Sequence, residues 1–211
     1  HFLRRQTGFL RVLPVQFCLL IPHYNHHEQL LRFLPVVAAQ NLPCIIVDDG
    51  SHPESLAQLR SALPQYPDVT LVAMPYNRGK GRAIKTGVTW AASQGYSHVI
   101  QIDADGQHNV ADIPRFMALA QDFPHALISG RPTFDESAPA VRRHGRKITS
   151  AVCMLETFST AIRDGLCGFR VYPVASFEKL QDRYYLGNRM DFDTEILVKS
   201  VWLGIPLKYL D

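Results

Sequence analysis

Two aspartates separated by one residue stand directly after a hydrophobic segment at 99–102. They are Asp103 and Asp105, and Gly106 after them allows a sharp backbone turn, so that both carboxylates can face one point. Mg²⁺ and Mn²⁺ prefer oxygen ligands and are usually held by one or two carboxylates together with substrate phosphates. The pair therefore predicts a divalent-metal site that binds a diphosphate.

A third ligand for this ion can come from Gln107 or His108, and the amide oxygen of Gln107 suits a hard cation better. An Asp-x-Asp-Gly sequence also caps turns, so a purely structural role for the two aspartates is the alternative. The histidines show no HExxH or similar zinc spacing, which argues against a zinc enzyme.

A second polar segment, Asn77-Arg78-Gly79-Lys80-Gly81, precedes a predicted helix. Its backbone amides, together with Lys80 and Arg82, can receive a phosphate or a base carbonyl. The segment is neither a Walker loop, which needs Gly-Lys-Ser/Thr, nor a dinucleotide fingerprint, whose third glycine is absent. Taken alone, it is equally consistent with an ordinary basic helix start.

Two further charged clusters follow in the second half of the chain. The segment 191–195 holds three carboxylates near a predicted helix at 194–203, where Asp193 can also be the N-cap. The densest basic run covers 142–147 and contains Arg142, Arg143, His144, Arg146 and Lys147. This run suits an anionic membrane surface, or simply a solvated helix face.

The elements that must position these residues alternate along the chain, which predicts an α/β fold with a parallel sheet covered by helices. Predicted strands lie at 17–21, 44–47, 69–73, 98–102, 126–129 and 168–172, with an edge strand at 205–211. Predicted helices lie at 28–40, 53–63, 81–94, 110–121 and 194–203, and an amphipathic stretch covers 143–162. Ligands of open parallel sheets bind outside the carboxyl ends of the strands. Because polar clusters follow each of the first four strands, we expect these four loops to line one edge, although each alone can be turn chemistry.

Length and composition indicate one folded domain. The 211 residues are 46% hydrophobic and 19% charged, unlike a disordered chain. We expect a tail or remnant at 1–16 before the main domain at 17–211, which we expect to be truncated at its C-terminus. The net charge of +3 gives no general case for nucleic-acid binding, and no apolar run is long enough to span a bilayer. The four cysteines lack CxxC spacing and predict reduced, buried thiols of an intracellular protein.

The ordered motifs together carry a resemblance. They are Ile21-Pro22-His23-Tyr24-Asn25, Val47-Asp48-Asp49-Gly50-Ser51, Asn77-Arg78-Gly79-Lys80-Gly81, Asp103-Ala104-Asp105-Gly106-Gln107-His108 and Cys167-Gly168-Phe169-Arg170. This set resembles the family-2 glycosyltransferases, and most closely the branch that transfers sugars to polyprenyl and dolichol phosphates. The resemblance implies a GT-A fold, a mostly parallel sheet sandwiched by helices, and inverting transfer from a nucleoside-diphosphate sugar.

The resemblance also implies site roles. The nucleotide sugar would be held by Pro22, Tyr24, Asn25, Asp49, Lys80 and Asp103, and the metal, Mg²⁺ or Mn²⁺, by Asp103, Asp105 and Gln107. Phosphate and acceptor contacts would come from Arg131, Arg146 and Arg170, and catalytic roles from Asp105 and Asp193. One departure is His26-His27-Glu28, where the family often has Glu directly after Asn.

The acceptor decides whether a general base is needed. A hydroxyl acceptor needs one, for which Asp193 matches best and Asp191 and Glu195 are alternatives, whereas a lipid phosphate is already anionic. The resemblance favours a lipid-like acceptor and a location in the cytoplasm or at the cytoplasmic face of a membrane. A sugar-phosphate nucleotidyltransferase and a nucleotide-sugar-binding module without turnover are the alternative functions.

Overall fold

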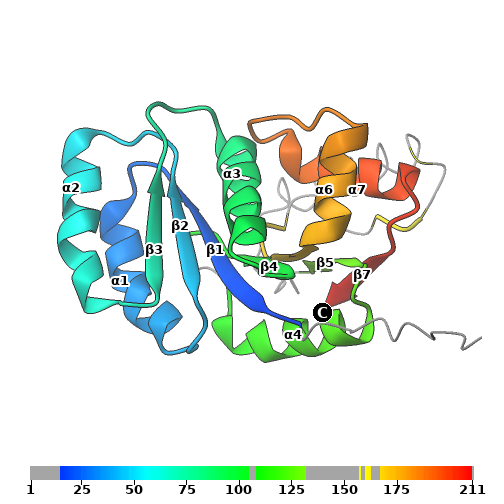
Figure 1. The fold of residues 1–211 in the computed structure, drawn as a ribbon, viewed down its shortest axis with the longest axis horizontal. Coiled ribbons are helices and arrows are strands. Elements are labelled where there is room, and N and C mark those ends of the chain that lie inside the picture. The colour runs from blue at the N-terminus through cyan, green and yellow to red at the C-terminus, as the bar shows by residue number, and fades with distance from the viewer. Residues whose placement is uncertain (1–14, 105–107, 132–156, 158–159, 163–166, 211) are drawn as a thin grey trace, which may run out of the picture.

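The computed structural model describes residues 15–104, 108–131, 157, 160–162 and 167–210. These residues form one seven-stranded sheet flanked by helices (Figure 1). In the order β3-β2-β1-β4-β6-β5-β7, the strands are Val69–Ala73, Cys44–Asp48, Phe17–His23, His98–Gln101, Arg170–Pro173, Leu127–Gly130 and Leu207–Leu210. The α-helices are α1 (His27–Ala38), α2 (Pro53–Ala62), α3 (Lys80–Ser93), α4 (Ile113–Asp122), α6 (Val174–Arg183) and α7 (Phe192–Trp202), with short 3₁₀ turns at Leu63–Gln65 and Val110–Asp112.

The sheet is mostly parallel, as the sequence predicted. Strands β1 to β4 pair in parallel, and β5 pairs in parallel with β7, which lies at the sheet edge as expected. Strand β6 is the exception, because it lies between β4 and β5 and runs antiparallel to both. This insertion brings the second half of the chain into the middle of the sheet, next to the strand that precedes Asp103.

Two hydrophobic cores lie on the two faces of the sheet. Successive side chains of a strand point to opposite faces, so Cys18 and Leu20 of β1 pack with α3, α6 and α7, whereas Leu19 and Ile21 pack with α1, α2 and α4. A sheet covered on both faces explains why its strands are continuous hydrophobic runs rather than alternating ones.

Some predictions fell short or lie outside the described residues. Helix α6 was not predicted, although Val174, Phe177 and Leu180 are buried at helical spacing. Residues 1–14 of the tail predicted at 1–16, and most of the stretch at 143–162 with the basic run, lie outside the described residues. Strand β1 begins at Phe17, where the predicted domain begins.

The cysteines that the structure describes agree with the prediction. Cys18, Cys44 and Cys167 are buried, and burial raises the pKa of the Cys18 thiol to about 12. Cys153 lies outside the described residues. Among the helices in the described ranges, none has the length and apolar character needed to cross a membrane.

The contact between α3 and β1 generates a stability prediction. A Cβ atom at Gly87 would overlap the buried side chain of Leu20, so Gly87→Val is expected to lower the free energy of unfolding by about 1–3 kcal/mol. Thr89→Val introduces the same residue at an exposed position of the same helix and should change it by less than about 0.5 kcal/mol. Urea unfolding measures both, and equal midpoints for the two variants would contradict this packing.

Candidate functional site

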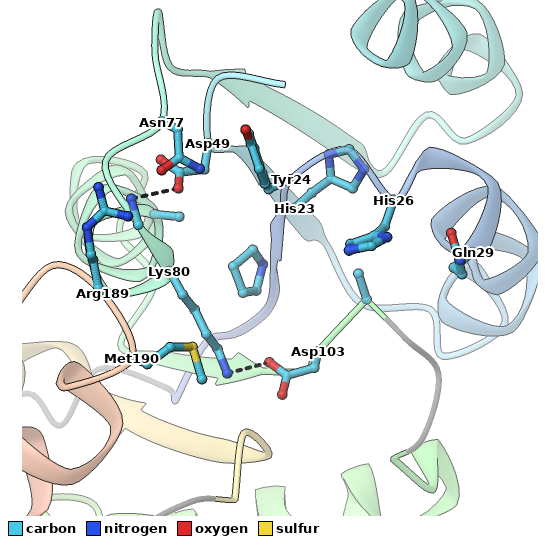
Figure 2. Close-up of a pocket in the computed structure, with 14 residues that line it drawn as sticks. His23, Tyr24, His26, Gln29, Asp49, Asn77, Lys80, Asp103, Arg189 and Met190 are labelled. Atoms are coloured by element: carbon cyan, nitrogen blue, oxygen red, sulfur yellow. Dashed lines mark hydrogen bonds and ion pairs between the residues drawn. The ribbon is translucent and has the colours of Figure 1, made fainter. Parts of the chain in front are cut away.

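A cleft of about 840 Å³ opens at the carboxyl edge of the sheet. The loops that follow β1, β2, β3 and β4 line it, together with the loop between α6 and α7 (Figure 2). Of the residues named from the sequence, those that line this cleft are Pro22, Tyr24, Asp49, Lys80 and Asp103. The four predicted loops therefore do meet at one edge, as parallel strand topology requires.

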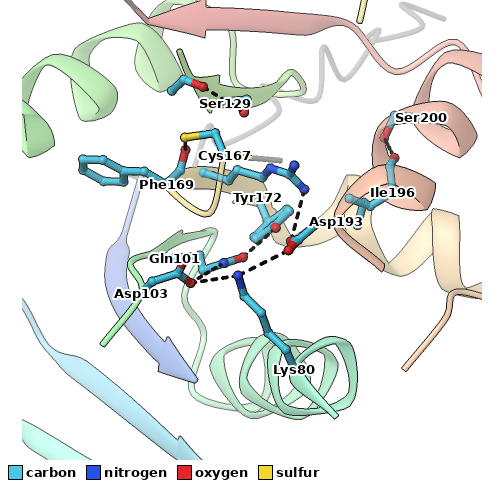
Figure 3. Close-up of polar contacts among 12 residues, drawn as sticks. Lys80, Gln101, Asp103, Ser129, Cys167, Phe169, Tyr172, Asp193, Ile196 and Ser200 are labelled. Carbon is cyan, nitrogen blue, oxygen red and sulfur yellow. Dashed lines mark hydrogen bonds and ion pairs between the residues drawn. The ribbon is translucent and has the colours of Figure 1, made fainter. Parts of the chain in front are cut away.

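The centre of the polar network is the ammonium group of Lys80, in the first turn of α3. Its Nζ lies 2.9 Å from Asp103 Oδ1 and 3.3 Å from Asp193 Oδ2 (Figure 3). On the far side, Asp193 Oδ1 lies 3.6 Å from a guanidinium nitrogen of Arg170. Charges of alternating sign thus run from the cleft at Asp103 into the protein at Arg170.

The network keeps Asp103 and Lys80 ionised. Burial alone would raise the pKa of Asp103, but the hydrogen bond from His108 and the charge of Lys80 outweigh it and hold that pKa well below its usual range. Burial likewise opposes the charge on Lys80, but the two carboxylates raise its pKa above the ordinary lysine value. The cleft therefore presents a fixed anion next to a fixed cation.

The carboxylate of Asp103 is positioned by neighbours in β4 and β6. Gln101 Nε2 donates to Asp103 Oδ1 at 3.3 Å, and the hydroxyl of Tyr172 donates to Gln101 Oε1 at 2.7 Å (Figure 3). A Cβ atom at Gly168 would overlap the Asp103 carboxylate. The glycine of the Cys167-Gly168-Phe169-Arg170 motif thus leaves room for Asp103.

Asp193 does not line the cleft. Its side chain is only 3% exposed and reaches the cleft through Lys80. It lies inside α7, after Phe192, and is therefore not the helix N-cap. The alternative carboxylates have other partners: Asp191 accepts from the amide of Arg189, and Glu195 accepts from the amide of Gly187.

The arginines differ from the sequence expectation. We expected Arg170 to contact phosphate, but its side chain is fully buried beside Asp193, so in this structure it does not reach the cleft. Arg131 is exposed at the end of β5, where its amide donates to Leu210 O, and it does not line the cleft. The remaining predicted residues, Asp105, Gln107 and Arg146, lie outside the described residues.

The loops after β1 and β2 are tied together by buried hydrogen bonds. His23 Nδ1 lies 2.8 Å from Asp48 Oδ1, and Asp48 also accepts bonds from the amide and the hydroxyl of Ser51. The Ser51 hydroxyl accepts from the amide of Asn25, whose own side chain accepts from the amide of His52. Asn25 is therefore used to hold the loops and is absent from the cleft lining.

Asp49, the residue after Asp48, also holds a loop in place. Its two carboxylate oxygens accept hydrogen bonds from the amides of Arg78 and Gly79, at 2.8 Å and 2.7 Å. These bonds fix the loop that carries Lys80 to the end of β2. Asp49 can still face a ligand, because it lines the cleft (Figure 2).

The structure also adds cleft residues that the sequence did not indicate. His26 and Gln29 come from the start of α1, and Arg189 and Met190 come from the loop between α6 and α7. The only local signal for this loop is the turn-forming pair Gly187-Asn188 before a helix. Motif spacing carried no sign that a loop some 110 residues beyond Lys80 closes the same cleft.

The comparisons with known proteins agree with this architecture. The model of the family described as "Glycosyl transferase family 2" matches residues 18–186. The chain belongs to glycosyl transferase family 2. Four of the five motifs quoted above lie within the described residues, and the aspartate motif lies there in part.

Similar proteins in the family include two curated relatives. A dolichyl-phosphate beta-glucosyltransferase of Dictyostelium discoideum is 25% identical over 92% of this chain and 64% of its own length. A polyprenol monophosphomannose synthase of Mycolicibacterium smegmatis is 32% identical over 50% of this chain and 42% of its own length. This chain thus spans less than two thirds of either relative.

A solved structure gives the fold. A mannosyltransferase from Pyrobaculum calidifontis, in complex with GDP-Man and Mn²⁺, superposes with a TM-score of 0.64 at 18% identity, over 92% of this chain and 54% of that one. The GT-A fold that the sequence resemblance implied is confirmed.

The described residues of this chain provide part of a site for a divalent ion. Asp103 is ionised and its side chain is 27% exposed, so it can supply one carboxylate oxygen. Within the described ranges, no group of three or more His, Cys, Asp or Glu side chains is arranged to hold a metal. A site completed by phosphate oxygens and water needs only one or two carboxylates.

The buried Asp48 generates a prediction about pH. Burial opposes its ionisation, but the hydrogen bonds from His23 and Ser51 outweigh this and lower its pKa. A carboxyl whose folded pKa is lowered stabilises the protein above its unfolded pKa of about 3.9, and this stabilisation is lost as pH falls below that value. Asp48→Asn should therefore lower the free energy of unfolding by about 1–3 kcal/mol at pH 7, with a gap that narrows below about pH 3.9.

Urea unfolding between neutral and acid pH measures this gap. Asp122→Asn, at the exposed end of α4, is the matched control and should leave the pH dependence unchanged. A constant difference between Asp48→Asn and the wild type at all pH values would contradict the assignment.

Proposed function

We propose that this chain is the catalytic domain of a transferase that moves a sugar from a nucleoside-diphosphate sugar to a polyprenyl phosphate, with inversion at the anomeric carbon. The observation that carries the proposal is the Lys80 ammonium on the cleft wall between Asp103 and the buried Asp193, in a chain of this family. The relatives named for dolichyl-phosphate and polyprenol substrates support the acceptor class.

The donor would lie along the carboxyl edge of the cleft. Tyr24 and Asp49 lie at the ends of β1 and β2, where a base and ribose can be held. Lys80, at the N-terminus of α3, would contact the diphosphate. Mg²⁺ or Mn²⁺, held by Asp103 with Asp105 and Gln107 as further candidates, would neutralise negative charge on the departing diphosphate.

The burial of Asp193 supports a phosphate acceptor. A general base must lie within about 3 Å of the proton that it removes, and Asp193 is enclosed between Lys80 and Arg170 rather than in the cleft. The phosphate of a polyprenyl phosphate is already anionic at neutral pH, so it can attack without a general base. Its phosphate oxygen would form a bond to the anomeric carbon as the bond to the donor's β-phosphate oxygen breaks, so that a nucleoside diphosphate leaves and one displacement inverts the centre.

In this scheme Asp193 acts through Lys80. It would hold the ammonium in place from inside the protein, while Asp103 contacts the same ammonium from the cleft side. Arg131 and Arg146 stay candidates for contact with the acceptor phosphate. We expect the protein to act at the cytoplasmic face of a membrane, where such acceptors lie.

Loss of the Asp103 carboxylate tests the donor site. Asp103→Asn is expected to lower sugar transfer by about 100-fold or more, because electrostatic stabilisation of the leaving group is lost. Asp112→Asn, which removes a carboxylate that pairs with Arg115 at the start of α4, should leave transfer unchanged. Transfer from a panel of UDP- and GDP-sugars is measured, with circular dichroism as the folding check. Wild-type transfer by Asp103→Asn would refute the proposed site.

The choice of acceptor tests the role of Asp193. The wild type is expected to glycosylate a polyprenyl phosphate and to leave the corresponding polyprenol unmodified, since the alcohol needs a base and Asp193, the carboxylate predicted for that role, lies outside the described cleft lining. Thin-layer chromatography of the lipid products distinguishes the two. Efficient transfer to the polyprenol would show that a base acts in the cleft and would contradict a phosphate-only acceptor.

A further inference from the structure

The rim of the cleft carries the most exposed apolar side chains of the described residues. Tyr185, Met190 and Tyr76 are 75%, 66% and 57% exposed, and they exceed every other large hydrophobic side chain in the described ranges. They come from two loops that are more than 100 residues apart in sequence. Large exposed apolar side chains that gather at one place indicate an interaction site.

The two loops lie side by side at the N-terminus of α3. One joins β3 to α3 and the other joins α6 to α7, and both reach the upper edge of the molecule as drawn (Figure 1). They touch where a Cβ atom at Gly79 of the first loop would overlap Asn188 O and the Arg189 side chain of the second, and the amide of Arg82, in α3, donates to the same Asn188 O at 3.0 Å. We call the surface formed by Tyr76, Arg78, Arg82, Tyr185, Arg189 and Met190 the rim.

Positive charge accompanies the apolar side chains. Arg78, Arg82 and Arg189 are all exposed, and the guanidinium of Arg78 lies 5.3 Å from the centre of the Tyr76 ring. Three acids stand nearby: Asp49, which is buried and accepts from the amides of Arg78 and Gly79, Glu195 and Asp191. Glu195 is paired with Lys199 at 2.6 Å, which leaves Asp191 as the exposed acid against three arginines.

The outward side chains do not result from a loosely held loop. Lys85 donates to Leu186 O, Lys199 donates to Tyr185 O at 2.6 Å, and Glu195 accepts from the amide of Gly187 at 2.8 Å. The backbone under Tyr185 is therefore anchored from α3 and α7. Its ring stays exposed although the residues beside it are fixed.

We propose that the rim docks the protein onto a bilayer surface that carries anionic lipid. Tyrosine and methionine side chains can enter the boundary between headgroups and acyl chains, while arginines contact lipid phosphates. This inference rests on the proposed function, because the phosphate of a polyprenyl phosphate stays at headgroup level and the cleft must face that layer to reach it. Met190 and Arg189 belong both to the rim and to the cleft lining.

The opposite edge of the sheet offers a matched control. Phe123 follows α4, is 40% exposed, and has the ammonium of Lys208 at 3.9 Å from its ring centre. Arg60 is exposed in the last turn of α2. These residues are of the same kinds as those of the rim, an exposed aromatic side chain and basic side chains, but they do not line the cleft.

Vesicle co-sedimentation tests the proposal, with phosphatidylcholine vesicles that contain or lack phosphatidylglycerol. The wild type should bind the anionic vesicles, and binding should fall as salt screens the charges. Tyr76→Ser/Tyr185→Ser should bind about tenfold more weakly, and Arg78→Gln/Arg82→Gln should lose about fivefold per arginine. Phe123→Ser and Arg60→Gln should bind like the wild type.

The outcomes separate the two proposals. If the wild type does not bind anionic vesicles, the proposed docking surface is refuted. If the rim variants bind like the wild type, it is also refuted, and binding is then assigned to another part of the chain. Calorimetry with UDP and GDP reports on the donor site independently. Nucleotide binding without vesicle binding would refute only the rim, whereas vesicle binding without nucleotide binding would refute only the transferase.

Discussion

The ammonium of Lys80 between two carboxylates is the interaction on which the site depends. Asp103 follows β4, Lys80 opens α3, Asp193 lies in α7 and Arg170 begins β6, so four elements meet in one row of alternating charges. Taking a charge out of water costs several kcal/mol unless a partner is placed accurately. Each charge in the row therefore constrains where the next can lie, and the insertion of β6 beside β4 is the topology that allows it. The fold of the second half of the chain therefore determines the geometry of the cleft.

This row also separates the task of holding the site from the task of facing the ligand. Asp103 is part of the cleft lining, whereas Asp193 and Arg170 are enclosed and act only through the side chains before them. A carboxylate that is enclosed between two cations, outside the cleft lining, lies out of reach of a proton on an acceptor bound in the cleft. The chemistry that suits such a cleft is one whose nucleophile arrives ionised. A phosphate acceptor meets that requirement, and an alcohol does not.

The sequence predicted which loops meet at the carboxyl ends of the strands, but it did not predict the strand order at the centre of the sheet. Polar loops after the first four strands were assigned to one edge because the carboxyl ends of parallel strands share it, and Tyr24, Asp49, Lys80 and Asp103 do line one cleft. Long-range pairing had no such local signal. Arg170 was assigned to phosphate contact from the resemblance, and nothing near it in sequence showed that its partner would be Asp193, 23 residues away. Asp193 was interpreted as a base or an N-cap because the helical pattern was taken to start at Thr194, whereas α7 starts at Phe192 and turns Asp193 inward. Arg189 and Met190 stand in a loop whose position depends on where β6 inserts, and that insertion was not predicted.

The loop between α6 and α7 illustrates how support and exposure are combined. Its backbone amide and carbonyl groups are bonded to side chains of α3 and α7, which fixes the entry to Asp193 and one wall of the cleft. Those contacts need only the backbone of residues 185–187, so they do not account for a tyrosine and a methionine that point into solvent on either side. Exposed apolar side chains in a rigid loop carry an aggregation risk and add nothing to the core. Their position beside the cleft, among three arginines, is explained if the cleft takes its acceptor from an anionic lipid surface, because the groups that meet the surface then also bring the reacting phosphate to the cleft.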